Sequence, residues 1–498
     1  MTEIAMPEPV QPAKPPKQEG GTATPWRDNI EAMLMAIIMA IVLKYFIVEA
    51  YRIPTGSMQP TLMGNDATGI YDRILVDKFS YQFSDPDRFD VAVFRYPLDR
   101  SKNYVKRIVG IGPEHFRIHN GDLWRRDTQD QPWELIRRPA NVVDETWLKL
   151  NRDDATSGMF FDGGRPGWSS GRDFTVEGAA RLRFGEDKNS IVDTYNDGYP
   201  DAFKDQISSL KRGSGSHPVG DLRIAGTLSV SADTQWVAFE MREGALAYDF
   251  RLPGPAAPEG ATPEVRQRDL TEVVGGQSYQ ATEFTKAGEP MRLAANTEYS
   301  FGAENLDDLL TLELNGEVLA QAPVASNPNQ ASALAIEVTR GTVAFEDVTV
   351  YRDIYYTPGN VSEYYIPEGQ YFMMGDNTLD SADSRAWTEH RMERLTENGD
   401  LELLIGNRRG DGSGSQSDFR NDLNPLPSPM SNPGGSPITW FRDEWGQLHD
   451  FLPSEFQNAN PETLPAPFVP RDHILGRAIS VFWPIRPFDG IWRFKMVD

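Results

Sequence analysis

The sequence predicts a mainly β protein with an N-terminal transmembrane helix, a β-rich domain after it, and an inserted β-sandwich or jelly roll. An almost wholly apolar stretch from Ile30 to Val48 predicts the helix, and short alternating runs separated by turn signals predict the strands. At 498 residues the chain is too long for one compact core, so several domains are expected.

The apolar stretch is long enough for a membrane helix. At about 1.5 Å per residue it reaches roughly 28 Å, close to the hydrocarbon thickness of a bilayer. Only Glu31 and Lys44 interrupt it, and Trp26 and Tyr45 suit the membrane interfaces. Residues 1–25 are rich in proline and lack apolar periodicity, which predicts a disordered tail rather than a cleaved signal peptide. A buried core helix is the alternative interpretation.

The distribution of cations around this stretch predicts its orientation. Lys14, Lys17 and Arg27 precede it, whereas Arg52 is the cation that follows soon after. The positive-inside rule therefore favours a single-pass protein with its N-terminus in the cytoplasm and most of the chain outside.

Composition excludes several classes of function. The chain has 49 Lys and Arg against 73 Asp and Glu, for a formal charge of −24, so a nucleic-acid partner is not expected. Cysteine is absent, which rules out disulfides, zinc thiolate sites and a cysteine nucleophile. The sequence shows no metal or nucleotide motif, so we expect neither a metal nor another cofactor.

Turn signals divide the β regions. Asn120-Gly121 predicts a hairpin in the first β region, and the character of the chain then changes over residues 127–352. Within 222–352, alternating runs and the turn signal Asn315-Gly316 predict a sandwich or jelly roll. This part loosely resembles concanavalin-like sandwiches, which often bind carbohydrate, but an insert that is purely structural or binds protein fits equally well.

The expected organisation has seven parts. In chain order they are a disordered tail (1–25), a transmembrane helix (26–49), a first catalytic segment (50–126), an inserted domain (127–352), a second catalytic segment (353–387), an irregular polar insert (388–468) and a third catalytic segment (469–498).

A serine and a lysine carry the chemistry. Ser57 lies in a Gly- and Pro-rich turn soon after the apolar stretch, and its hydroxyl needs a base before it can attack a substrate. The six histidines lie in polar or loop-like surroundings and not in a triad-like motif. Lys106 has Val105, Ile108 and Val109 as neighbours, so burial could lower its pKa from about 10.4 toward 7–8. A lysine that faces solvent from an edge strand is the alternative.

Four segments together resemble the signature boxes of bacterial type I signal peptidases, in the family's order and after the family's anchor. They are residues 53–58 (Ile-Pro-Thr-Gly-Ser-Met), 90–97 (Asp-Val-Ala-Val-Phe-Arg-Tyr-Pro), 106–110 (Lys-Arg-Ile-Val-Gly) and 375–385. The resemblance covers residues 30–126, 353–387 and 469–498, less than half of the chain.

The resemblance implies a largely β catalytic domain with a Ser-Lys dyad. Ser57 would be the nucleophile and Lys106 the general base. The Thr55 hydroxyl and the Ser57 N–H would stabilise the oxyanion, and the Ser381 hydroxyl would orient the lysine amine. Met58 would line a pocket for small substrate side chains.

Further residues match positions that brace the site by ion pairing in the family, and these are Arg107, Asp376, Asp383 and Arg385. Two segments depart from the family pattern. Residues 111–114 read Ile-Gly-Pro-Glu where the family has Leu-Pro-Gly-Asp, and Leu379 and Asp380 stand where Asp and Asn are common. Neither change affects the serine or the lysine.

The implied activity is that of a serine endopeptidase of the signal peptidase I type, which cleaves after Ala-x-Ala through an acyl-enzyme. Its partners would be exported preproteins and the lipid bilayer, near the secretion translocon, together with an unknown ligand of the inserted domain. The expected location is the bacterial cytoplasmic membrane, with the catalytic domain extracytoplasmic.

Two other classes of protein compete with this interpretation. A self-cleaving protease of the SOS-repressor type shares the serine and lysine, but it is soluble and has an N-terminal DNA-binding domain. A membrane-tethered binding protein could use the inserted sandwich on a degenerate peptidase scaffold. The presence of Ser57, Lys106 and Ser381 argues against degeneration.

Overall fold

The computed structural model describes most of the chain. The described residues are 25–65, 69–151, 160–162, 169–185, 190–194, 198–199, 215–270, 285–325, 331–359, 361–396, 398–410, 439–451, 462–483, 485–486 and 491–497. The disordered tail expected over 1–25 lies outside these residues, apart from Pro25. Strands dominate the described chain, so the prediction of a mainly β protein is confirmed.

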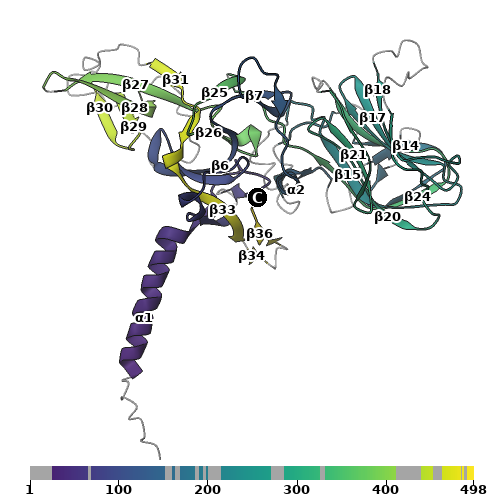
Figure 1. Ribbon diagram of the computed structural model, residues 1–498, viewed down its shortest axis with the longest axis horizontal. Helices are drawn as coiled ribbons and strands as arrows, with labels where there is room; N and C mark the ends of the chain where they lie inside the picture. Colours follow the sequence, from purple (N-terminus) through teal and green to yellow (C-terminus); the bar gives the residue numbers. More distant parts are fainter. Residues whose placement is uncertain are drawn as a thin grey trace, which may run out of the picture. The chain divides into compact units, whose positions relative to one another are not determined.

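The N-terminal unit, Met1–Glu49, contains the helix α1 (Pro25–Val42), drawn in purple in Figure 1. The transmembrane helix expected over 26–49 is not found. α1 ends at Val42, a π-helical turn η1 (Leu43–Ile47) follows, and the strand β1 (Val48–Arg52) begins. The 18 residues of α1 also include the charged Arg27, Asp28 and Glu31. Among the described residues, no helix combines the length and the apolar character needed to cross a bilayer.

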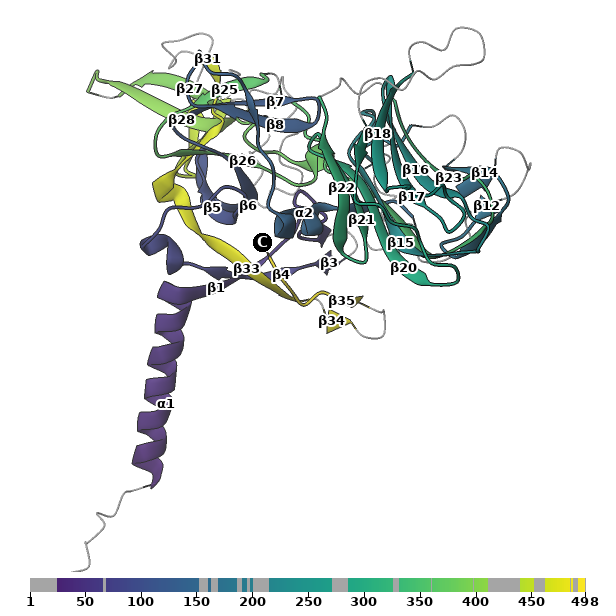
Figure 2. The ribbon, with the colours of Figure 1, turned by 45° about the vertical axis from the view of Figure 1, so that its right-hand side comes forward.

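The second unit, Ala50–Asp498, is built around an antiparallel sheet with the order β1–β4–β33–β5–β6–β26–β32, in which β36 also pairs with β33. Its remaining strands are β4 (Arg73–Asp77), β5 (Val91–Tyr96), β6 (Asp99–Ile111), β26 (Gln370–Met374), β32 (Phe468–Pro470), β33 (Ile474–Trp483) and β36 (Lys495–Met496). Strands from both ends of the chain therefore share one sheet, and everything between β6 and β26 is inserted into it (Figure 2).

Short elements also belong to the second unit. They are β2 (Gly64–Asn65), β3 (Ile70–Tyr71), η2 (Ser80–Gln82), α2 (Ala140–Thr146), η4 (Thr378–Asp380), η6 (Arg471–His473), β34 (Ile485–Arg486) and β35 (Ile491–Trp492).

A second sheet has the order β25–β7–β8–β9, from β25 (Glu363–Ile366), β7 (Glu114–His119), β8 (Asp122–Arg126) and β9 (Glu134–Leu135). The hairpin predicted at Asn120-Gly121 joins β7 to β8, with His119 opposite Asp122. Both turn residues have positive φ, 55° and 95°, as a type I′ turn requires.

Two further sheets pack face to face as a sandwich (Figure 2). The first has the order β10–β24–β15–β20–β21–β22, with β13 beside β24, and its strands are β10 (Leu148–Lys149), β13 (Phe174–Glu177), β15 (Leu222–Val230), β20 (Glu298–Leu306), β21 (Leu309–Leu314), β22 (Glu317–Pro323) and β24 (Thr342–Arg352). The second has the order β12–β11–β14–β23–β16–β17–β18–β19, and its strands are β11 (Phe160–Asp162), β12 (Ser169–Ser170), β14 (Ala180–Phe184), β16 (Trp236–Glu243), β17 (Leu246–Pro253), β18 (Glu264–Asp269), β19 (Thr285–Ala287) and β23 (Ser332–Val338).

The sandwich core forms because every second side chain points inward. Ile224 and Leu228 of β15 meet Phe239 and Met241 of β16 in one buried cluster. The predicted turn at Asn315-Gly316 is confirmed, since Leu314 pairs with Glu317 across it. Strands also form before residue 222, in the stretch that reads as polar in the sequence.

The insert over 388–468 is expected from its sequence to be irregular, and this prediction is wrong for the part that the structure describes. That part forms an antiparallel sheet, β30–β29–β28–β27–β31, from β27 (Thr388–Leu395), β28 (Leu401–Gly410), β29 (Thr439–Asp443), β30 (Leu448–Phe451) and β31 (Glu462–Pro465). Met392, Leu404 and Phe441 supply a small buried core for it, a pattern that its polar composition obscures. The Gly- and Ser-rich middle of this insert lies outside the described residues.

Candidate active site

The turn that carries Ser57 lies between β1 and β2. Its backbone closes on itself, because the Gln59 amide donates to the Gly56 carbonyl at 3.2 Å and the Leu62 amide donates to the Met58 carbonyl at 2.8 Å. Ser57 is buried with only 8% of its surface exposed, while Thr55, two residues earlier, faces solvent. The Ser57 side chain is therefore shielded, although the turn that carries it reaches the surface.

Lys106 reaches this turn from the middle of the central sheet. It lies on β6, opposite Ala92 of β5, and only 5% of its surface is exposed. The Lys106 Nζ lies 2.7 Å from the Ser57 Oγ, a hydrogen-bonding distance. The alternative of a solvent-facing edge lysine is therefore excluded by the position of β6 between β5 and β26.

Burial controls the charge of this amine. Desolvation lowers the pKa of Lys106 to about 8, although the carboxylates of Asp383 and Asp376 oppose this shift. At pH 7 roughly one amine in ten would then be neutral, against roughly one in three thousand for a free lysine. A neutral amine can accept the Ser57 proton over the same 2.7 Å.

A buried ion pair between Arg107 and Asp376 lies next to Lys106. Arg107 is fully buried, and its Nε and Nη2 donate to the two carboxylate oxygens of Asp376 at 2.9 and 3.0 Å. Its Nη1 also donates to the Phe89 carbonyl at 2.8 Å. The Thr61 hydroxyl, which donates to Asp376, accepts a further bond from Arg107. Because Arg107 follows Lys106 on β6, this network anchors the strand that carries the amine.

The loop 375–385 carries a second ion pair. Arg385 donates to both carboxylate oxygens of Asp383 at 2.7 Å, and Asp383 accepts the Gly375 amide at 3.1 Å. Burial alone would raise the pKa of Asp383, but the charge of Arg385 and the hydrogen bonds that the carboxylate accepts together hold the pKa below its usual value. The pair therefore shapes this loop as an ionised unit.

The loop also contacts the turn that carries Ser57 directly. The Asn377 amide donates to the Ser57 carbonyl at 3.1 Å, and its side chain donates to the Gly56 carbonyl at 3.1 Å. A Cβ on Gly375 would lie 2.3 Å from both the Ser57 carbonyl and the Ser381 Oγ, so only glycine allows this approach. Thr61 and Asn377 are site residues that the sequence prediction missed. One signal for them is present in the sequence, because Thr61 lies close to the segment 53–58 and Asn377 lies within 375–385. Their contacts, however, depend on the tertiary fold.

Three of the predicted residues differ in how well their positions match their expected roles. The Thr55 Oγ1 lies 3.5 Å from the Ser57 Oγ. The Ser381 Oγ lies beside the turn and next to the Asp383 carboxylate, and no hydrogen bond joins it to Lys106 among the described residues. Met58 is 1% exposed and packs in a core with Ile53 and Leu62. The lysine-orienting role of Ser381 and the pocket role of Met58 stay predictions.

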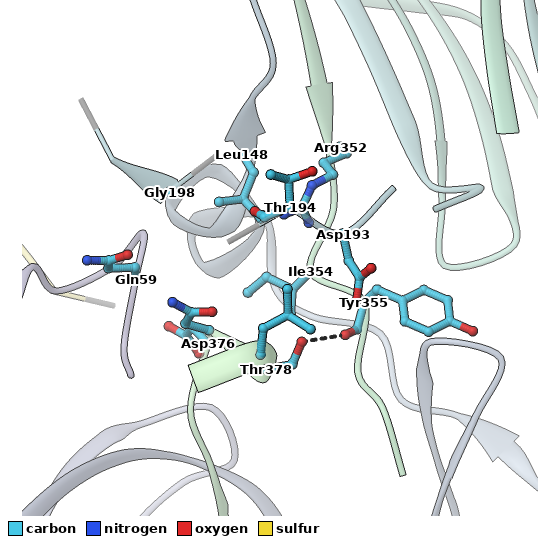
Figure 3. A pocket seen from close by; sticks show the side chains of 12 residues that line it. Gln59, Leu148, Asp193, Thr194, Gly198, Arg352, Ile354, Tyr355, Asp376 and Thr378 are labelled. Carbon is cyan, nitrogen blue, oxygen red and sulfur yellow. Dashed lines mark hydrogen bonds between the residues drawn. The ribbon is translucent and has the colours of Figure 1, made fainter. Parts of the chain in front are cut away.

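A small cavity of about 20 Å³ lies beside the site (Figure 3). Gln59 of the Ser57 turn and Asp376 and Asn377 of the loop 375–385 line it. Asp193 and Arg352 line it from the inserted chain. A cavity of this size holds about one water molecule.

A group of carboxylates elsewhere could reach one cation. Oxygens of Asp122, Asp221 and Asp307 lie within 4.8 Å of one another. Arg138 donates to Asp307 at 3.2 Å, so this group already has a positive neighbour. None of its members touches the Ser57–Lys106 pair in any contact of the described residues, and we assign no metal to it.

Comparison with known proteins identifies the family. The family model described as signal peptidase, peptidase S26, matches residues 26–153 and 308–399. The signal peptidase I of Leptolyngbya laminosa is 30% identical over 166 residues, which cover 30% of this chain and 78% of that protein. The signal peptidase I of Pseudomonas fluorescens is 44% identical over 87 residues, covering 15% of this chain and 28% of that protein. The chain belongs to the signal peptidase family, peptidase S26.

The extent of these matches is limited. The chain spans 49% of a Synechocystis relative and 28% of the Pseudomonas protein. Solved structures give low overall similarity. A galectin of Caenorhabditis elegans has a TM-score of 0.20 at 11% identity and covers 27% of this chain and 86% of its own. The carbohydrate-binding module CBM66 of Bacillus subtilis has a TM-score of 0.22 at 10% identity, over 41% of this chain and 95% of its own.

Replacing Arg107 should strongly destabilise the fold. Arg107→Ala leaves the Asp376 carboxylate buried without its partner, which typically costs about 3–5 kcal/mol. Arg394→Ala is the control, because it breaks a partly exposed pair with Glu402 that is worth about 1 kcal/mol at most. Urea denaturation of both variants measures the difference, and equal losses would contradict a bracing role for Arg107.

Replacing Lys106 should stabilise the fold at neutral pH. The pKa of Lys106 is about 8 in the folded state and 10.5 when free, so burial of the charged amine opposes folding fully below pH 8 and less as pH rises to 10.5. Lys106→Met removes this cost of up to about 3 kcal/mol. The free energies of unfolding at pH 7 and pH 10 should show a gain for the variant that shrinks at the higher pH. A gain that does not depend on pH would contradict the lowered pKa.

Proposed function

We propose that this protein is a serine endopeptidase that removes signal peptides from exported preproteins. The observation that carries the proposal is the 2.7 Å separation of the Lys106 Nζ and the Ser57 Oγ, both buried. The similarity to signal peptidases I from several bacteria supports the choice of substrate class.

In the proposed reaction, neutral Lys106 takes the Ser57 proton while the Oγ attacks the carbonyl carbon of the scissile bond. The Ser57 N–H and the Thr55 hydroxyl then donate to the oxyanion of the tetrahedral intermediate. Lys106 returns the proton to the leaving amine as the C–N bond breaks, which leaves an acyl-enzyme. Lys106 next deprotonates a water molecule, which hydrolyses the ester and restores the Ser57 hydroxyl.

The surrounding residues support this sequence of steps. Asp383 and Asp376 oppose the lowered pKa of Lys106, but the shift by burial is larger, so the amine is poised near neutral pH. Because the base must be uncharged, the rate should rise as pH passes through about 8. Ser381, beside the turn, would orient the amine after a rotation of its hydroxyl, and the ion pairs of Arg107 and Arg385 would keep the site rigid.

The substrate and the location are further parts of the proposal. By family resemblance, small side chains as in Ala-x-Ala would precede the cut, near Met58. α1 carries exposed apolar side chains along its length, including Leu34, Ile38 and Ile41. We propose that this surface holds the protein at a lipid membrane, where preproteins arrive, with the second unit outside the cytoplasm.

Removal of either member of the pair should abolish cleavage. Ser57→Ala and Lys106→Ala should each lower the cleavage rate of a preprotein with an Ala-x-Ala site by roughly a thousandfold or more, because a positioned base alone contributes about 10²–10⁴. Ser480→Ala, a buried serine of β33, and Lys102→Ala, on the same strand as Lys106, are matched controls that should keep wild-type rates. Cleavage by either dyad variant at the rate of its control would contradict the mechanism.

A further inference from the structure

Residues 355–357, just after the inserted domain 127–352, are hydrogen-bonded to the loop 375–385. The Thr378 hydroxyl donates to the Tyr355 carbonyl at 2.8 Å, the dashed line in Figure 3. The Arg385 Nη1 donates to the carbonyl and hydroxyl oxygens of Thr357 at 2.9 and 3.0 Å. Any shift of residues 355–357 would therefore be passed to the loop that contacts Ser57.

The Tyr355 ring is in turn held by the insert. It stacks on His217 with 5.2 Å between ring centroids and 11° between planes. On another side it packs against Gly121, where a Cβ would lie 2.6 Å from the ring. The His217 Nδ1 lies 3.0 Å from Asp193, which also accepts the His217 amide at 2.9 Å. The insert thus presents a preformed His-Asp pair to Tyr355.

A second contact from the insert reaches the nucleophile turn itself. Gly198 packs against Gln59, two residues after Ser57, so closely that a Cβ on Gly198 would lie 3.1 Å from the Gln59 Cβ. The same Cβ on Gly198 would lie 3.3 Å from the Leu148 side chain, so Gly198 occupies a tight space beside Gln59 and Leu148. Gln59 is itself 2% exposed, so this contact is closed to solvent.

These two contacts act on the two backbone segments that define the site. One supports the turn after Ser57, and the other supports the loop whose Asn377 amide binds the Ser57 carbonyl. The turn also contacts Lys106 through Ser57, and the loop carries Asp376 and Asp383, whose charges act on the pKa of Lys106.

We propose that the insert positions the Ser57–Lys106 pair, with His217 acting through Tyr355 and Gly198 acting through Gln59. This inference rests on the proposed function for its catalytic consequence. The two residues are positioning residues, since neither touches the reacting atoms. Small displacements of reacting groups matter, because a misplacement of about 1 Å can cost about a hundredfold in rate.

The full-length protein allows a controlled test with paired variants. His217→Ala removes the ring beside Tyr355, and Gly198→Val pushes on Gln59. Both should lower kcat for preprotein cleavage by about tenfold, with KM within about twofold. Both should also move the rising limb of the pH–rate profile upward from about 8, because water then reaches Lys106.

Matched controls separate positioning from general stability. His449→Ala breaks another His-Asp pair, with 2.8 Å between the His449 Nε2 and Asp443, in the sheet β27–β31. Gly302→Val adds a side chain 3.2 Å from the flexible Glu313 carboxylate in the sandwich. Both controls should keep kcat within about twofold of wild type. His217→Phe, which keeps a flat ring but loses the pair with Asp193, should restore kcat to within about threefold.

Amide hydrogen exchange provides a readout that does not depend on cleavage. Exchange of residues 375–381 should accelerate in His217→Ala and Gly198→Val but not in either control. This result would support positioning even if the wild-type protein failed to cleave preproteins, which would refute only the proposed function. Unchanged exchange in this loop, equal losses of kcat in His217→Ala and His449→Ala, or no rescue by His217→Phe would overturn the inference.

Discussion

Burial of one amine beside one alcohol is the constraint on which the site depends. Lys106 lies within the central sheet with its Nζ 2.7 Å from the Ser57 Oγ. An ammonium ion is costly to desolvate, so this position favours the neutral form and makes lysine usable as a base. The same burial opposes folding while the amine is charged, and the fold must offset that cost elsewhere. The site thus gives up some stability to keep a larger fraction of the amine uncharged near neutral pH, as is common where pKa values are strongly shifted.

The fold buries the Lys106 amine by assembling the site from distant parts of the chain. The turn with Ser57 follows β1, the lysine lies on β6, and the loop 375–385 follows β26. The ion pair of Arg107 with Asp376 fastens β6 to this loop, and the pair of Arg385 with Asp383 holds the loop in shape. The insert between β6 and β26 is therefore attached next to the reacting groups and not at a remote edge.

Local patterns predicted the site better than they predicted the fold around it. Ser57 and Lys106 were found because a Gly- and Pro-rich turn and an apolar strand are visible in short windows, and the Asn-Gly hairpins were found for the same reason. The membrane helix expected over 26–49 is not found among the described residues, where Arg27, Asp28 and Glu31 share α1 with its apolar residues and the helix ends at Val42. The sheet over 388–465 was missed because only a few buried residues, such as Phe441, hold it together. Thr61 contacts Asp376 and Asn377 contacts Ser57, in each case across hundreds of residues, which no local pattern records.

The most direct test of this account is the titration of Lys106 itself. In the full-length protein with ¹³C-labelled lysine, NMR follows the Cε resonance against pH, and the resonance that is missing in Lys106→Arg identifies the residue. The account predicts a midpoint near pH 8, the value to which burial lowers the pKa. A midpoint close to the 10.5 of a free lysine would mean that the amine is hydrated and charged, and the account would then be wrong.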